Sequence, residues 1–139
     1  MSFEEKSTWI YAVLAVTIPV IYFATIIGLV QTTAVTEIAY QGPLLAAIGA
    51  AIVIAIVANI AVAISSPKDA GKADQRDKDI NRLGEYVGGI VLSVCVLVPF
   101  GLAMAEVDYF WIANAIYLAF IVSAISATTV KLVAYRRGF

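Results

Sequence analysis

The sequence predicts an all-α integral membrane protein, a four-helix bundle with both termini in the cytoplasm (N-in, C-in). Three observations predict this class. Hydrophobic residues make up 62% of the chain and charged residues 14%, whereas a typical soluble domain has about 45–50% and about 25%. Four apolar stretches reach the roughly 20 residues that a helix needs to cross a bilayer. The basic residues lie between or beyond these stretches, in segments that such a threading places on one side.

With 139 residues, the chain has room for one transmembrane domain, residues 1–139, since ordinary domains use roughly 100 to 200 residues. The first helix is predicted over about residues 8–30. This run is too long for the apolar core of a usual signal peptide, so we expect a permanent helix. The second is predicted over about residues 43–65, with Pro43 in the first turn, where a missing N–H is tolerated.

The third helix is predicted over about residues 84–105 and the fourth over about residues 110–130. Residues 66–83 form a charged cytoplasmic loop between the second and third helices. Within this loop, Ile80 and Leu83 have the spacing of one helix face. We therefore expect the loop to be partly helical and to merge into the third helix.

Two prolines fall inside predicted helices, Pro19 in the first and Pro99 in the third. Each removes one backbone hydrogen bond and is expected to kink its helix. A membrane helix tolerates this loss when neighbouring helices or polar side chains satisfy the freed carbonyl. The hydroxyls of Thr17 and Ser93 are nearby candidates.

The orientation follows from the position of the basic residues. They precede the first helix, occupy the loop between the second and third, and follow the fourth. These residues are Lys6, Lys68, Lys72, Arg76, Lys78, Arg82, Lys131, Arg136 and Arg137. Because cytoplasmic loops carry an excess of Lys and Arg, both termini and the central loop are predicted to be cytoplasmic. We expect a multi-pass protein of the plasma membrane.

The central loop alternates in charge sign. Asp74 with Lys78 and Asp79 with Arg82 have helical spacing and are predicted to pair, and Glu85 is a second candidate partner of Arg82. Two interpretations remain open: a solvated, self-paired helix and a docking surface for a cytoplasmic protein. The residues of the candidate docking surface are Asp74, Arg76, Asp77, Arg82 and Glu85.

The loop sequence Asp74-Gln75-Arg76-Asp77-Lys78-Asp79-Ile80, followed by Gly84, resembles the D-x-R-D-x-x-I loop of small uncharacterised four-helix membrane proteins of actinobacteria and archaea. Residues 110–120 and 135–139 resemble the actinobacterial members in particular. The resemblance implies a four-helix architecture over the whole chain. It implies no biochemical activity, because that family has none agreed. Some members are encoded beside small helix-turn-helix regulators, which implies a regulatory protein as partner.

Small residues recur every four positions in the second and fourth predicted helices, and a G-x-x-x-G pattern starts the third. The residues are Ala47, Ala51, Ala55, Gly84, Gly88, Ala115, Ala119 and Ser123. Such rows let helix backbones approach closely in lipid. Packing within one chain and the seam of a homodimer are both consistent with this pattern.

Two amides, Asn59 and Asn114, fall inside predicted helices. An amide in hydrocarbon must find a hydrogen bond. We expect each to bond a backbone carbonyl or a hydroxyl, and their different depths argue against a direct pair. The alternative is that they line a substrate path.

The sequence contains no histidine and none of the common catalytic or nucleotide-binding motifs, so we expect no enzyme, no cofactor and no metal site. Acidic residues interleaved with the basic ones argue against direct binding of nucleic acid. The predicted function is a non-catalytic, regulatory or accessory membrane protein. Its expected partners are the lipid bilayer, a cytoplasmic regulatory protein, and a second copy or larger membrane complex. The alternative is a small transporter or channel, as a monomer or a dimer.

Overall fold

The computed structural model describes residues 2–65, 67 and 73–138. In these residues the elements are α1 Phe3–Val30, the short 3-10 helix η1 Val35–Glu37, α2 Gln41–Ser65, α3 Gln75–Cys95, α4 Leu97–Met104 and α5 Tyr109–Arg137. α3 and α4 follow each other closely and form one crossing. The described part of the chain thus has four helices long and apolar enough to cross a membrane. The predicted all-α, four-helix class is confirmed.

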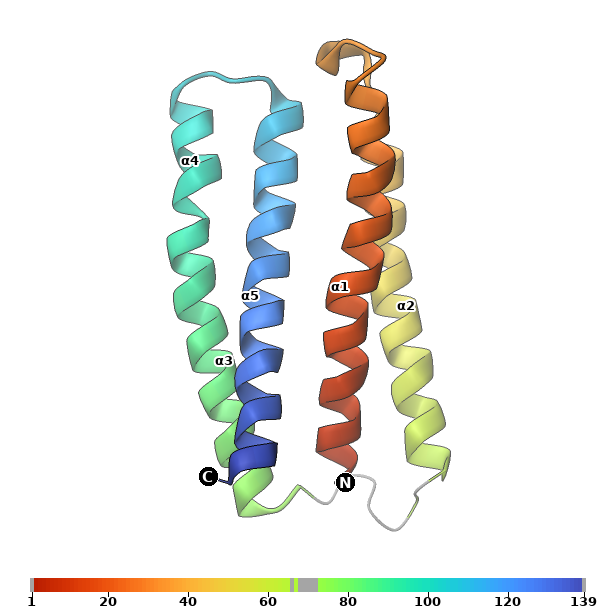
Figure 1. Cartoon of the computed structure of the whole chain (residues 1–139), viewed down its shortest axis with the longest axis vertical. Coiled ribbons are helices and arrows are strands. Elements are labelled where there is room, and N and C mark those ends of the chain that lie inside the picture. Colours follow the sequence, from red (N-terminus) through yellow and green to blue (C-terminus); the bar gives the residue numbers. More distant parts are fainter. Residues whose placement is uncertain (1, 66, 68–72, 139) are drawn as a thin grey trace.

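Successive crossings run in opposite directions, so the start of α1, the end of α2, the start of α3 and the end of α5 lie at one end of the bundle (Figure 1). We name it the basic end, because the elements reaching it carry the described Lys and Arg residues there: Lys6, Arg76, Lys78, Arg82, Lys131, Arg136 and Arg137. The opposite, acidic end has two short connections that carry Glu37, Glu106 and Asp108. Of the predicted central loop, Lys68, Asp69 and Lys72 lie outside the described residues.

The helices extend beyond the predicted apolar stretches. α1 begins at Phe3, because Ser2 caps it by accepting a 3.1 Å hydrogen bond from the Glu5 N–H. α3 begins at Gln75, well before the predicted start, and α5 continues to Arg137. Hydropathy marks only the part of a helix that lies in hydrocarbon. Capping residues and charged residues that favour a helix extend these helices beyond the apolar stretches.

The two internal prolines have different outcomes. α1 continues through Pro19 as one element. In the third crossing, Val96 separates α3 from α4 shortly before Pro99. Pro99 has no N–H to donate to the carbonyl of Cys95, which is the last residue of α3. The interruption therefore lies where this hydrogen bond is missing.

The predicted role of the nearby hydroxyls is wrong. Thr17 donates to the carbonyl of Val13, and Ser93 donates to the carbonyl of Gly89, both at 2.8 Å. A hydroxyl in a helix reaches the carbonyl three or four residues before it. The proline frees the carbonyl four residues before it, which is Ala15 for Pro19 and Cys95 for Pro99. Neither hydroxyl can reach that carbonyl.

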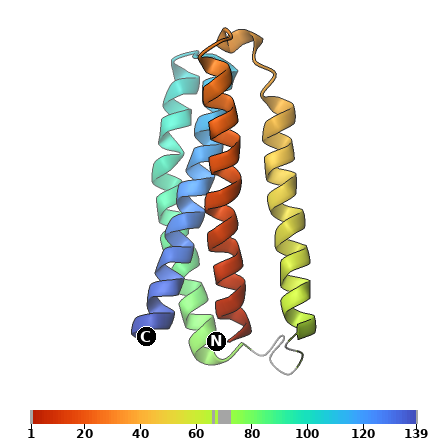
Figure 2. The same cartoon turned by 45° about the vertical axis from the view of Figure 1, so that its right-hand side comes forward.

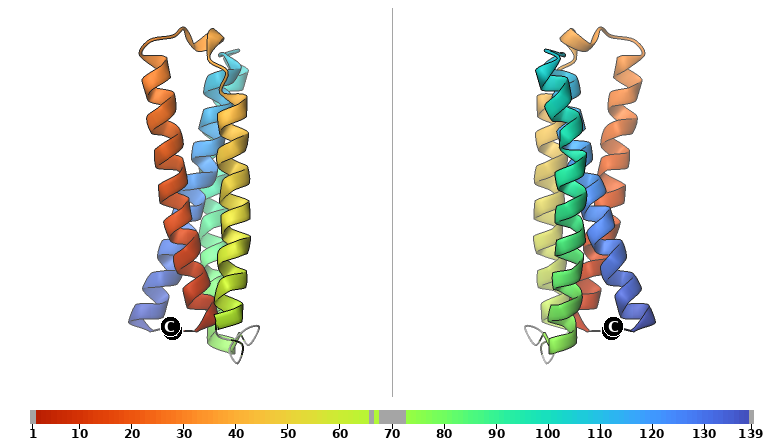
Figure 3. Two further views of the ribbon diagram at one scale, coloured as in Figure 1. Left: turned by 90° about the vertical axis from the view of Figure 1, so that its right-hand side faces the viewer. Right: turned by 90° about the vertical axis from the view of Figure 1, so that its left-hand side faces the viewer.

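α1 and α5 form the centre of the bundle. α2 packs against α1, α1 packs against α5, and α5 packs against both α3 and α4. Within the described residues, α2 makes no comparable contact with α3 or α5. The bundle is consequently open along the side between α2 and α3 (Figures 2 and 3).

A buried hydrophobic cluster lies toward the acidic end and combines Tyr22, Ile26, Ile38 and Phe110. Its rings meet edge to face, as in the Tyr40–Phe110 pair, whose ring centres are 5.4 Å apart. Many other large apolar side chains are exposed. This suits a chain surrounded by lipid, where apolar surface has no reason to be buried.

Candidate functional site

The candidate docking surface lies at the start of α3, where a reciprocal cap fixes the backbone. The Asp77 N–H donates to the Asp74 carboxylate at 2.7 Å, and the Asp74 N–H donates to the Asp77 carboxylate at 3.4 Å. This capping box satisfies two donors that a helix start otherwise leaves free. Asp74 is thus a structural cap, and the predicted ion pair between Asp74 and Lys78 is wrong.

Asp77 is buried, with 6% of its surface exposed. Its carboxylate accepts hydrogen bonds from the hydroxyl of Ser2 at 3.1 Å and from the phenol of Tyr135 at 2.9 Å. The N-terminus, the first turn of α3 and the last turns of α5 meet at this one side chain. A partner cannot reach Asp77 in this arrangement. Asp77 is therefore not part of an accessible docking surface, contrary to the expectation from the sequence.

Further contacts tie the ends of α1, α3 and α5 together at the basic end. The guanidinium of Arg76 donates to the carbonyl of Tyr135 at 3.2 Å. The guanidinium carbon of Arg136 lies 5.6 Å from the centre of the Trp9 ring, within the range of a cation–π contact. The basic end is therefore held together by side chains from three helices.

Glu85 pairs with Lys131, whose ammonium lies 2.5 Å from the carboxylate. The predicted pairs of Arg82, with Glu85 or with Asp79, do not form. Glu85 pairs with Lys131 because the aliphatic part of the Lys131 side chain packs on Gly84. This places the ammonium beside Glu85, the next residue of α3.

Of the five predicted docking residues, four are exposed: Asp74, Arg76, Arg82 and Glu85. They share this end of α3 with Tyr86, which is 67% exposed. The buried face of the same helix consists of Asp77, Ile80, Gly84 and Gly88. One face of α3 is thus locked into the bundle, and the other presents charge and an aromatic ring.

The small-residue rows of α3 and α5 pack against each other within the chain. Ser123 donates a 2.8 Å hydrogen bond to the carbonyl of Gly88, and a methyl group on Gly88 would lie 3.0 Å from Ala127. Ala119 is buried and Ala115 is half-buried. Gly84 and Gly88 thus pack against α5 within the chain, which leaves these two residues unavailable for a homodimer seam. In α2, Ala47 packs on the acidic-end cluster, while Ala51 and Ala55 line a groove described below.

Both intramembrane amides bond to a hydroxyl and to a backbone carbonyl, as the sequence predicts. Ser7 donates to the Asn59 side-chain oxygen at 2.5 Å, and Tyr22 donates to that of Asn114 at 2.8 Å. Each amide nitrogen donates to the carbonyl four residues earlier, at 2.8 Å. Asn59 joins α2 to α1 toward the basic end, and Asn114 joins α5 to α1 toward the acidic end, so the structure does not bring the two together.

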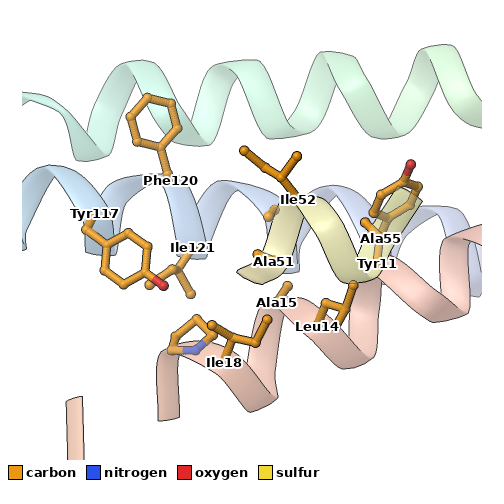
Figure 4. Close-up of a pocket in the computed structure, with 12 residues that line it drawn as sticks. Tyr11, Leu14, Ala15, Ile18, Ala51, Ile52, Ala55, Tyr117, Phe120 and Ile121 are labelled. Carbon is orange, nitrogen blue, oxygen red and sulfur yellow. The ribbon is translucent and has the colours of Figure 1, made fainter. Parts of the chain in front are cut away.

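A groove of about 300 Å³ runs along the open side of the bundle, between α2 and α5 with α1 as its floor (Figure 4). Its lining is apolar apart from two phenols: Tyr11, Leu14, Ala15, Ile18, Pro19, Ala51, Ile52, Ala55, Tyr117, Phe120, Ile121 and Ala124. Neither Asn59 nor Asn114 lines it. The groove can bind apolar groups and offers no evident polar path.

Sequence reasoning identified Asp77 and Glu85 but missed their partners. Ser2 and Tyr135 lie at the two ends of the chain, so no sequence spacing relates them to Asp77. Lys131 is likewise distant from Glu85 along the chain. One available signal was the Asp-x-x-Asp spacing from Asp74 to Asp77, which is that of a capping box.

Comparison with models of protein families, with curated proteins and with solved structures found no match. The resemblance of residues 74–80 to an actinobacterial and archaeal family therefore stays a prediction. Within the described residues, no group of three or more His, Cys, Asp or Glu could hold a metal ion. What the basic end offers chemically is recognition through exposed guanidinium, carboxylate and phenol groups.

Proposed function

We propose that this chain is a non-catalytic plasma-membrane protein that acts through protein partners, with its basic end in the cytoplasm. The orientation rests on the positive-inside rule, because the described basic residues gather at one end and the acidic end has none in its described connections. Both termini are then cytoplasmic. A regulatory protein docked at the basic end, or a larger complex to which the chain is an accessory subunit, is the expected partner.

The observation that carries this proposal is the division of α3 into a locked face and a free face. Buried Asp77 and Ile80 fix the helix against the bundle, which leaves Arg82 and Tyr86 pointing away from it. Arg and Tyr are enriched among the residues that dominate protein interfaces. Because the free face is held in one geometry, a partner would lose little freedom in ordering it.

The test is capture of a partner after extraction in mild detergent, comparing the wild type with the double variant Arg82→Ala/Tyr86→Ala. The wild type should bring down a cytoplasmic protein that the variant loses, while helical content stays unchanged. Glu37→Ala at the acidic end is the control and should retain the partner. Equal capture by all three chains, or none by the wild type, contradicts the proposal.

The alternative of a small transporter or channel gains no support from the groove. Its lining at the level of Pro19 and Phe120 is apolar, and a substrate path needs polar groups to replace water. The two amides are already hydrogen-bonded between helices. The non-catalytic part of the proposal is supported by a sequence without histidine, which leaves the hydroxyls and the thiol of Cys95 without a histidine base to activate them.

A further inference from the structure

The open side of the bundle holds a second groove section that continues the first toward the basic end. This section has a volume of about 570 Å³, lies between α3 and α5, and reaches Asn81, Glu85, Thr128 and Lys131. The two sections share the lining residues Tyr11, Phe120 and Ala124. Both volumes fall within the range of about 300 to 1,000 Å³ that is usual for ligand sites. The sections meet at these residues, so together they give a groove that is apolar at one end and carries polar and charged side chains at the other.

This polarity follows the depth profile of a bilayer. The apolar section lies beside the middle of α1 and α5, where Pro19 and Ile121 line it. The polar section lies toward the basic end, where the charged pair of Glu85 and Lys131 marks the edge of the third and fourth crossings. A phospholipid has an apolar chain and a polar headgroup in this same order.

The charged edge indicates the class of headgroup. Lys131 and Glu85 form a neutral pair, with 13% and 68% of their side chains exposed, so neither a simple anion nor a simple cation finds an unopposed charge. A headgroup with a phosphate and a primary ammonium complements both members of the pair. Its phosphate can accept from the Lys131 ammonium, and its ammonium can donate to the Glu85 carboxylate. A trimethylated ammonium has no N–H to donate and lacks the second interaction.

We propose that this groove binds a phospholipid of the phosphatidylethanolamine type, with an acyl chain along the apolar section and the headgroup at Glu85 and Lys131. The proposal is independent of the protein-partner function and of which end faces the cytoplasm. It rests on the continuity of the two sections and on the paired charges at their polar end.

The experiment is native mass spectrometry of the full chain released from vesicles that contain equal amounts of phosphatidylethanolamine and phosphatidylcholine with identical acyl chains. The wild type should retain phosphatidylethanolamine in preference. Glu85→Gln should lower that retention by about twofold to fivefold, the effect of losing an exposed ion pair, and leave phosphatidylcholine unchanged. Glu106→Gln, a matched change at the acidic end, should alter neither lipid.

A second variant tests the apolar section. Ala124 is exposed in the groove and lines both sections, so Ala124→Phe should fill the groove without disturbing the packed helices and should reduce retention of both lipids. Circular dichroism of each variant checks that it is folded. Equal retention of the two lipids by the wild type overturns the proposal, as does retention unaffected by Ala124→Phe. A groove occupied by a second copy of the chain, with no lipid retained, would also overturn it.

Discussion

The phenol of Tyr135 donates a 2.9 Å hydrogen bond to the carboxylate of Asp77, which ties the end of α5 to the start of α3. The hydroxyl of Ser2 donates to the same oxygen at 3.1 Å. One buried carboxylate thus holds three segments that are far apart in the sequence. Because Asp77 is locked in this way, the opposite face of α3 is kept free and in a fixed orientation.

Replacing Asp77 should destabilise the basic end. Asp77→Ala removes the capping box and leaves two hydroxyls without an acceptor, which should lower the free energy of unfolding by about 2 kcal/mol. Unfolding by sodium dodecyl sulfate in mixed micelles, followed by circular dichroism, measures the change. The matched control is Asp79→Ala, two residues later, where the carboxylate accepts, among the described residues, from exposed Gln75. Equal stability of the two variants would show that Asp77 does not hold the helices together.

Replacing two neighbouring glycines of α3 by alanine should change the free energy of unfolding in opposite directions. A methyl group at Gly88 would meet Ala127 at 3.0 Å and the Ser123 carbonyl at 3.4 Å, whereas one at Gly89 meets nothing within 4 Å. Gly88→Ala should therefore lower the free energy of unfolding by about 1–3 kcal/mol, because the added methyl group overpacks the interface. Gly89→Ala should raise the free energy of unfolding by about 0.5–1 kcal/mol, because alanine stabilises a helix more than glycine does. The same unfolding assay compares them, and a stabilising Gly88→Ala would contradict the close packing of α3 on α5.

The hydrogen bond between Tyr22 and Asn114 should couple α1 to α5. Asn114→Leu leaves the buried Tyr22 hydroxyl without its 2.8 Å acceptor, and we expect a loss of about 1 kcal/mol in the free energy of unfolding. Tyr22→Phe in the same chain removes the stranded hydroxyl, so the double variant should be more stable than the sum of the two single changes predicts. Strict additivity in this double-mutant cycle would mean that the two side chains do not interact.

The crossings could be predicted from the sequence because each depends on a local property. A run of apolar residues such as 43–65 must become a helix in hydrocarbon, where every backbone group needs an internal partner. The start of α3 was less accessible to this reasoning. Its charges suggested ion pairs at helical spacing, whereas Asp74 and Asp77 are used as a cap and as a buried acceptor.

Contacts between distant segments could not be predicted in the same way. Nothing in the spacing of Glu85 indicates that Lys131, rather than Arg82, lies beside it. That choice depends on how closely α5 approaches α3, which Gly84 permits. The open side of the bundle was also unpredicted, because hydropathy gives the length of each helix and says nothing about which neighbours it packs against.

The proposed orientation gives the last prediction. Gln31 and Tyr109 are exposed at the acidic end, and Tyr109 has 81% of its surface accessible. In a Cys95→Ala background, a cysteine at either position should react with a membrane-impermeant maleimide added to intact cells. A cysteine replacing Lys78 at the basic end should react only after the membrane is permeabilised, because the positive-inside rule places it in the cytoplasm. The reverse pattern would put the free face of α3 outside the cell, where a cytoplasmic regulator could not reach Arg82 or Tyr86.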